Sequence, residues 1–193
     1  MNRRRILILN GHPDAGGGHF LDAAVEAYAE AAREGGHEVQ RLDVAQLNFP
    51  LLRSAHDWQH EAAPPAIVEA QAAIARAQHL AIFYPLWLGG MPALLKGFLE
   101  QALRPGFAFD MSGGGWKKRL KGRSARIVVT MGMPAWLYRV YFRAHSLKSL
   151  ERNILAFVGI RPLRETLIGL VEGSAPRRER WLRRLHDLGR AGN

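Results

Sequence analysis

Short apolar runs alternate along the chain with segments in which apolar residues recur every three or four positions. The first run, at residues 5–10, predicts a buried strand, and the stripe from Leu21 to Ala32 predicts an amphipathic helix after it. Gly35 and Gly36 are expected to end that helix. The same alternation continues to the end of the chain, so we expect five strands interleaved with helices.

The remaining expected elements follow the same pattern. Further strands are expected at residues 37–44, 80–84, 126–130 and 161–171, and further helices after Pro64, from Pro92, within residues 147–158, and after Ser174, which is placed to cap the last helix. Two stretches depart from the alternation, the connection at residues 45–63 and a Gly- and Lys-rich excursion at residues 105–122. Connections as long as the first usually carry function.

Strands that alternate with helices indicate a parallel sheet with helices on both faces. No internal repeat and no linker divides the sequence, and 193 residues suit one α/β domain with a sizeable core. We therefore expect an α/β fold, with a five-stranded parallel sheet, in a single domain spanning residues 1–193.

Residues 79–100 carry the most specific local signal in the chain. An apolar run stops at Pro85, a bulky apolar loop containing Gly89 and Gly90 follows, and a helix opens at Pro92, where proline is tolerated best. In open α/β sheets, ligands bind at the carboxyl ends of the strands. This loop therefore predicts one wall of a pocket for a flat ring.

The chain has a formal net charge of +10, with basic clusters at residues 3–5, 117–123 and 177–184. Nucleic-acid binding is one interpretation of this charge, but no recognisable nucleic-acid motif accompanies it. Solvated loops and a solvated helix face are the interpretation we prefer. A positive field also attracts anionic ligands such as nucleotide cofactors.

Cysteine is absent from the sequence, which excludes disulfides and thiolate metal sites and fits a cytoplasmic protein. No run of about 18 apolar residues is present, so no membrane-spanning helix is expected. The apolar residues near the start are too few for a signal peptide and are expected to form the first strand.

The loop at residues 11–20, GHPDAGGGHF, lies between the first expected strand and helix. Its glycines could direct several backbone N–H groups at a phosphate. A Walker P-loop is excluded because Gly17 and Gly18 stand where lysine and Ser/Thr are required, and the dinucleotide motif GxGxxG is also absent. We expect an unspecialised phosphate loop, with His12 and His19 as additional donors.

One pair of histidines has the spacing of a metal motif. His56 and His60, with Asp57 between them, resemble the zinc-protease motif HExxH, but no third ligand is evident and we expect a surface pair without a metal.

Tyr138 and His145 are seven residues apart and would share a helix face, where both could hold a proton. The alternative for them is an aromatic patch that packs against a neighbour. No GxSxG motif is present, which argues against a serine hydrolase.

Several stretches together resemble the NAD(P)H:quinone oxidoreductase family of flavodoxin-like flavoproteins, the DT-diaphorase type. They are Gly11-His12-Pro13, Tyr84-Pro85-Leu86-Trp87, residues 90–98 (GMPALLKGF), residues 105–109 (PGFAF) and Thr130-Met131-Gly132, and the resemblance spans about residues 6–188. It implies a flavodoxin-like sheet of strand order 2-1-3-4-5, non-covalently bound FAD or FMN, NAD(P)H as electron donor and a homodimer. The two middle stretches are the most specific.

The resemblance also implies roles for individual residues. His12, Gly18, His19 and Phe20 would hold the phosphate side of the flavin; Pro85, Leu86, Trp87 and Leu88 would line its ring; Thr130, Met131 and Gly132 would meet its polar edge. Tyr138 and His145 match the family's tyrosine and histidine that steady charge on the reduced flavin, the histidine with a shift of one residue. Glycines and His19 stand where the family commonly has Ser or Thr.

These observations predict a flavin-dependent NAD(P)H:quinone oxidoreductase that transfers hydride through the flavin by a ping-pong route, with a small-molecule acceptor and no nucleic-acid partner. An azo- or nitroreductase of the same fold is a second hypothesis. A non-catalytic flavoprotein partner or electron carrier is a third, against which the positive charge and the excursion at residues 105–122 argue.

Overall fold

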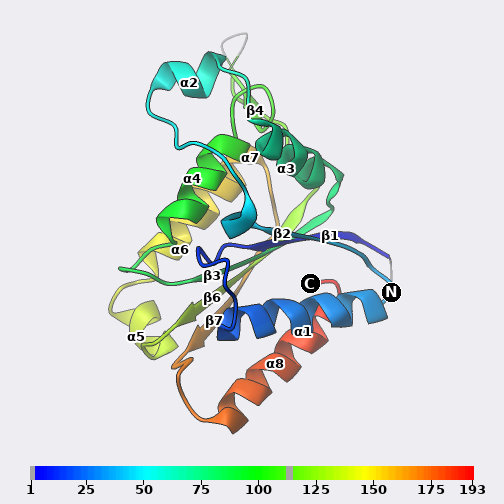
Figure 1. Cartoon of the computed structure of the whole chain (residues 1–193), viewed down its shortest axis with the longest axis vertical. Coiled ribbons are helices and arrows are strands. Elements are labelled where there is room, and N and C mark those ends of the chain that lie inside the picture. The colour runs from blue at the N-terminus through cyan, green and yellow to red at the C-terminus, as the bar shows by residue number, and fades with distance from the viewer. Residues whose placement is uncertain (1–2, 112–114) are drawn as a thin grey trace.

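A five-stranded parallel sheet forms the centre of the computed structural model, which describes residues 3–111 and 115–193 (Figure 1). Its strands, in spatial order, are β2 (Glu38–Asp43), β1 (Arg5–Asn10), β3 (His79–Pro85), β6 (Ser124–Met131) and β7 (Leu163–Gly169). Counting only these five strands, the order is 2-1-3-4-5, which confirms the expected flavodoxin-like topology.

Helices cover both faces of the sheet (Figure 1). One face carries α1 (Phe20–Glu34) and α8 (Ala175–Arg190), and the other carries α3 (Pro65–Arg76) and α4 (Ala93–Ala102). The alternation along β1 explains both layers: Ile6 and Ile8 belong to the apolar cluster under α1 and α8, whereas Leu7 and Leu9 belong to the opposite cluster. A strand buried on both sides therefore reads as a continuous apolar run.

The long connection at residues 45–63 contains structure that the hydrophobic pattern does not reveal. A 3₁₀ turn, η1 (Val44–Gln46), and a short helix, α2 (Ala55–His60), lie within it or at its start. The excursion at residues 105–122 holds a two-stranded hairpin of β4 (Phe109–Asp110) and β5 (Lys117–Lys118), although its residues 112–114 lie outside the described part of the chain. The helix and the strands inside these two stretches are too short to show a periodicity.

The segment after β6 differs from the single helix face expected for Tyr138 and His145. It consists of α5 (Ala135–Val140), α6 (His145–Ser149), a π-helical turn η3 (Leu150–Leu155) and α7 (Ala156–Val158). Arg143 and Ala144 have φ values of 52° and 47° and break the helical path between α5 and α6. Tyr138 and His145 therefore belong to separate helices, and the expectation of one shared face is wrong.

Two smaller expectations also change. The last strand is shorter than the expected residues 161–171, because Arg161 and Pro162 precede the ladder and Leu170 turns away from it with a φ of 56°. Ser174 is the N-cap residue of α8, but its side chain makes no capping hydrogen bond. Among the described residues, no helix combines the length and the apolar character needed to cross a bilayer.

Helix α8 lies so close to α1 that only glycine fits at one point of contact. A Cβ at Gly189 would lie 2.3 Å from the carbonyl oxygen of Tyr28, whose hydroxyl in turn donates to the carbonyl oxygen of Asn193 at 3.0 Å. Leu185, one turn earlier in α8, is fully buried against the same face. This contact fixes the position of α8, which carries part of the site described below.

We expect Gly189→Ala to destabilise the fold by about 1–3 kcal/mol, because the added methyl group must push two helix backbones apart. That loss exceeds the gain in helix propensity from replacing glycine by alanine. Urea denaturation followed by circular dichroism measures it. Arg183→Ala, on the exposed side of α8, is the matched control and should change stability by no more than about 0.5 kcal/mol. Equal stability of Gly189→Ala and the parent protein would contradict the close contact.

Candidate functional site

The carboxyl ends of β1, β3 and β6 meet at one edge of the sheet, where their loops surround a cavity of about 940 Å³. The cavity continues along α1 to the start of α8. Its lining residues are His12, Gly18, His19, Phe20, Leu21, Ala23, Pro85, Leu86, Trp87, Thr130, Met131, Gly132, Val171, Glu172, Ala175, Arg178, Glu179 and Leu182. Apolar walls from the β3 loop and polar groups from the β1 loop therefore face one space.

The loop after β1 is held in shape by side chains that bind its own backbone. The side-chain oxygen of Asn10 accepts from the N–H of His12 at 3.2 Å, and Nδ1 of His12 accepts from the N–H of Asp14 at 3.1 Å. An accepting Nδ1 places the proton of the neutral His12 ring on Nε2, which is then a donor for a ligand. Gly17 and Gly18 have φ values of 72° and 85°, a region that strongly favours glycine.

Two histidine rings stack at this loop. The ring centroids of His12 and His19 are 3.9 Å apart with planes 23° apart, and Nε2 of His19 lies 2.9 Å from Oδ2 of Asp14. Burial lowers the pKa of His12, and the charge of His19 lowers it further. The pKa of Asp14 is also lowered, first because its carboxylate accepts the Gly16 N–H and then because of His19. In the free protein His12 is therefore held in its neutral form.

The loop after β3 forms a tight turn that presents an indole. Trp87 and Gly90 exchange two backbone hydrogen bonds, of 2.9 and 2.8 Å, and the two residues between them have positive φ values of 46° and 76°. The Leu86 N–H donates to the carbonyl oxygen of Thr130 at 2.7 Å, which ties this loop to β6. Trp87 is half exposed and meets the edge of the His12 ring at 6.0 Å. One bulky ring therefore stands at the mouth of the cavity.

The loop after β6 passes close to β7 and leaves open space at Gly132. A Cβ at Gly169 would lie 2.4 Å from the Ala135 N, so β7 must carry glycine where this loop crosses it. At Gly132 a Cβ would meet no atom within 4 Å. Backbone groups at Gly132 are thus accessible to a ligand that enters the cavity.

The structure brings together most of the residues expected to hold a cofactor. Ten of the eleven line this cavity: His12, Gly18, His19, Phe20, Pro85, Leu86, Trp87, Thr130, Met131 and Gly132. Leu88 does not, because it occupies the exposed tip of the turn between Trp87 and Gly90. The lining residues from the start of α8, among them Arg178 and Leu182, were missed; the basic cluster at residues 177–184 was the available signal, interpreted as a solvated face.

Tyr138 and His145, the expected proton-handling pair, do not line the cavity. Tyr138 is buried, and its hydroxyl lies 2.7 Å from the Ser146 hydroxyl and accepts from the Leu147 N–H at 3.2 Å. His145 is exposed, and its Nδ1 is 2.8 Å from the Phe142 carbonyl oxygen, so Nδ1 is the donor and Nε2 is left for other partners. Tyr138 thus connects α5 to α6 in this chain.

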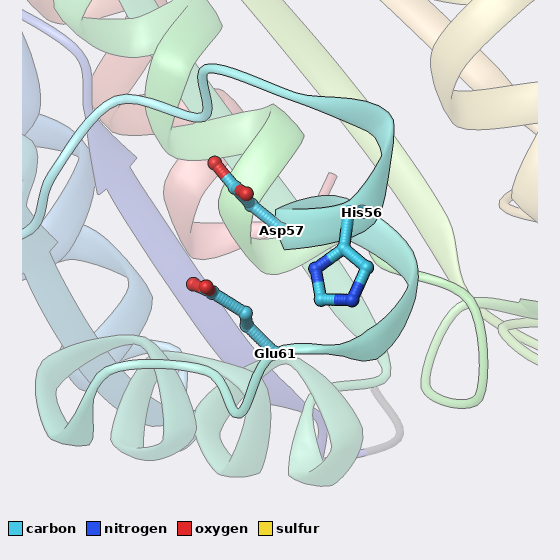
Figure 2. Close-up of side chains that lie close together, drawn as sticks. All are labelled: His56, Asp57 and Glu61. Carbon is cyan, nitrogen blue, oxygen red and sulfur yellow. The ribbon is translucent and has the colours of Figure 1, made fainter.

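One histidine of the α2 pair, His56, lies close to two acidic side chains, those of Asp57 and Glu61 (Figure 2). Ligand atoms of His56, Asp57 and Glu61 all lie within 4.8 Å of one another, and the rings of His56 and His60 are 5.2 Å apart. Both oxygens of Asp57 already accept hydrogen bonds that cap α2, from the Ser54 hydroxyl and from the Arg53 N–H. These two bonds, the hydroxyl first, lower the pKa of Asp57. Capping of α2 accounts for the position of Asp57.

A second, more apolar cavity of about 490 Å³ lies between α2, α4 and α7. Its walls include Trp58, Phe109 and Phe157, whose rings pack on one another with centroid distances of 5.3–5.8 Å. Lys96, Glu100 and Asn153 also line it. The connection at residues 45–63 therefore contributes packing around Trp58, away from the loops after β1 and β6.

Comparison with known proteins identifies the class. A family model described as "Flavodoxin-like fold" matches residues 4–188, and the chain belongs to this family. An NAD(P)H oxidoreductase of Haemophilus influenzae is 28% identical over 84% of this chain and 82% of its own length, and NAD(P)H dehydrogenase [quinone] 1 of Rattus norvegicus is 26% identical over 96% and 77%. A solved NAD(P)H:quinone oxidoreductase from Methanothermobacter marburgensis superposes with a TM-score of 0.83 at 25% identity, covering 100% of both chains. The resemblance expected from the sequence is confirmed.

We expect His19→Ala to raise the pKa of His12 toward its ordinary value of about 6.5. The substitution removes a like charge and uncovers one face of the His12 ring, and both changes favour the protonated form. An NMR titration of the imidazole resonances measures the shift. A His12 pKa that stays the same or falls in the variant would contradict the stacked arrangement.

Proposed function

We propose that this chain is a flavin-dependent NAD(P)H:quinone oxidoreductase whose flavin lies in the cavity at the carboxyl edge of the sheet. The observation that carries the proposal is the gathering of ten expected cofactor residues around that one cavity. Membership of the flavodoxin-like family and the names of the relatives support the same activity. When bound, a flavin supplies hydride transfer from NAD(P)H to an acceptor.

The donor set of the cavity fits a flavin. Trp87 and Leu86 offer apolar surface to a flat ring, and the accessible backbone at Gly132 offers polar groups to its edge. On the phosphate side, His12 offers Nε2, and Gly18 lets the backbone approach an anion closely because no side chain intervenes. Negative charge that develops at the ring edge is best stabilised by such pre-positioned donors.

FAD is the form of flavin that the shape of the cavity favours. Trp87 and Gly132 would hold the ring and Gly18 the first phosphate, and the part of the cavity beside α8 would then remain for a further group. That part is lined by Ala175, Arg178 and Leu182, which offer a cation and apolar surface to a second phosphate and an adenosine. A volume of about 940 Å³ accommodates the larger molecule.

Arg178 is positioned to act on an anion there. Its guanidinium donates to the Gly173 carbonyl oxygen at 2.5 Å, which fixes it at the start of α8, within the first turns where the helix dipole also favours negative charge. Glu172 and Glu179 line the same part of the cavity and oppose that field. We therefore assign the phosphate interaction to Arg178 and to the loop at residues 11–20 together.

The roles of Tyr138 and His145 remain part of the proposal. His145 keeps Nε2 available on an exposed helix start, which supports proton exchange with a bound acceptor. Tyr138 is buried and joined to Ser146 and Leu147, which supports a positioning role for α6 and hence for His145. An imidazole can hold or release the proton that accompanies hydride transfer.

We further propose that the working form is a homodimer, with one flavodoxin-like domain per subunit. The loops near the cavity and the helix after β6 expose large apolar side chains: Trp87, Leu88, Trp136, Val140 and Tyr141. Exposed apolar groups gathered in this way are typical of protein–protein contacts. A second copy over them would close the open side of the flavin site. Azo or nitro compounds, as alternative acceptors, would use the same opening.

The proposal predicts a yellow protein that consumes NADPH or NADH when menadione is added. Mass spectrometry of the small molecule released on denaturation should give FAD. Because donor and acceptor are expected to occupy the same place in turn, initial-rate plots at several menadione concentrations should be parallel. A colourless protein without turnover would contradict the function. FMN in place of FAD would contradict only the assignment of the cavity beside α8, and intersecting plots would contradict the shared place.

We expect Tyr138→Phe and His145→Ala to lower the turnover number by at least tenfold while flavin content falls by less than half. The reason is that both residues lie outside the cavity that binds the cofactor but follow the strand that points at it. A change in kcat without a change in the KM for NADPH separates this role from a loss of structure. Asn153→Ala, an exposed change in η3, is the control. Unchanged turnover in both variants would remove the pair from the mechanism.

A further inference from the structure

The opposite edge of the sheet, where the strands begin, contains a separate cavity of about 700 Å³. Figure 1 shows the start of β1 and the end of the chain on this side of the molecule, away from the loops that surround the flavin cavity. The lining residues are Arg3, Arg4, Gln78, His79, Gly122, Ser124, Ala125, Arg161, Pro162, Arg164 and Asn193. None of them belongs to the site proposed for the flavin.

This cavity is strongly basic. Its lining residues include four arginines and no acidic side chain. Within residues 3–111 and 115–193, none of the four guanidinium groups forms an ion pair, and Arg4 instead donates to the Gly192 carbonyl oxygen at 2.8 Å. Like charges gathered in one concavity repel one another unless an anion joins them.

A buried histidine in the same wall has an unused ring nitrogen. His79 is 2% exposed, its Nδ1 lies 2.7 Å from the Ser124 hydroxyl, and its Nε2 has no hydrogen-bond partner among the described residues. Burial, followed by the charges of Arg4, Arg126 and Arg164, lowers the pKa of His79 to about 3. Nδ1 and the Ser124 hydroxyl satisfy one another, and Nε2 of the neutral ring is left without the partner that a buried polar atom needs.

The largest electrostatic influences on His79 are of one sign. Arg4, Arg126, Arg164 and His37 each disfavour its protonation. Arg126 does not line the cavity but is also buried, with one guanidinium nitrogen bound to the Thr166 hydroxyl and Nε without a partner among the described residues. His79, with its unpartnered ring nitrogen, therefore lines the same space as the four arginines. Buried polar groups in native proteins are generally paired, so the unpartnered ring nitrogen of His79 indicates a missing partner.

We propose that this basic cavity at the amino edge of the sheet is a second anion site, which binds a small multivalent phosphate such as the di- or triphosphate group of a nucleotide. Arginine pairs with phosphate through two parallel hydrogen bonds, and several arginines favour a ligand with more than one charged group. The volume admits a short phosphate chain with an attached organic group. The site is independent of the flavin cavity.

A small ligand fits this surface better than a nucleic-acid backbone. The arginines converge on a concavity from the chain start, from Arg161 and from Arg164, whereas a nucleic-acid footprint is a stripe or a patch on one face. The basic clusters at residues 117–123 and 177–184 contribute only Gly122 to the lining. A single-stranded oligonucleotide is accordingly the competitor that the test includes.

The test is calorimetric titration of the flavin-loaded protein with inorganic tripolyphosphate at constant ionic strength. We expect one saturable site per chain. The double variant Arg161→Gln/Arg164→Gln should bind tripolyphosphate at least tenfold more weakly. Arg152→Gln/Arg183→Gln removes two exposed arginines elsewhere, changes net charge equally and should stay within twofold of the parent protein. Flavin content and menadione turnover, measured on the same samples, should be unchanged in both double variants.

Four results would overturn the proposal. They are the absence of saturable binding, an equal loss of affinity in the two double variants, release of flavin during the titration, and tighter binding of a ten-nucleotide single strand than of tripolyphosphate. Release of flavin would place the anion at the carboxyl edge, and tighter binding of the oligonucleotide would indicate a nucleic-acid surface. Because the titration does not depend on turnover, its failure is distinguishable from failure of the proposed enzymatic function.

Discussion

The pairing of β1 with β3 is the constraint on which the site depends. The two strands are neighbours in the sheet, but the chain leaves β1 toward α1 on one face and leaves β3 toward α4 on the other. Loops that diverge in this way cannot close over the strand ends, so a gap opens between them. The Gly11 N–H, which donates to the Phe83 carbonyl oxygen at 2.7 Å, holds the two loops at a fixed separation. The cavity is therefore a consequence of topology before any side chain is considered.

Side chains then give this gap two different halves. The β3 turn supplies the indole of Trp87, and the β1 loop supplies polar groups whose protonation the protein controls. The neutral form of His12 matters because a donor that is not already charged can respond to a phosphate by taking up a proton. The close contact of Gly189 with α1 extends the polar half, because it fixes the helix that carries Arg178. The packing of α8 on α1 therefore sets the position of Arg178 in the cavity lining.

Much of the architecture could be predicted because it depends on hydrophobic periodicity. Continuous apolar runs and 3.6-residue stripes are enough to locate five strands and their helices, and the known order of such sheets then places three loops together. That placement and the family resemblance together were enough to predict ten residues that line the cavity. The break at Arg143 and Ala144 could not be predicted, because neither residue type signals a positive φ. The hairpin of β4 and β5 is also too short to leave a pattern.

The role of α8 was hidden for a different reason. Arg178 lies in a run of arginines whose members look alike in sequence, and only the fold shows which one turns into the cavity. The same limit applies to the amino edge, where Arg4, Arg161 and Arg164 are distant in sequence and meet only in the folded chain. Charge clusters in sequence therefore identified only some members of the charge clusters in space. Parallel sheets make this common, because each edge collects residues from every strand.

The central claim is that a flavin occupies the gap between the loops after β1, β3 and β6. The most direct measurement is a titration of the flavin-stripped protein with FAD, FMN and riboflavin. Flavin fluorescence and tryptophan fluorescence are recorded, and the part due to Trp87 is obtained by comparison with Trp87→Phe. The account predicts one site per chain, affinity in the order FAD, FMN, riboflavin, and quenching of both fluorophores. Two results would contradict the account. One is the absence of saturable binding for all three flavins. The other is equal quenching of tryptophan fluorescence in the parent protein and in Trp87→Phe.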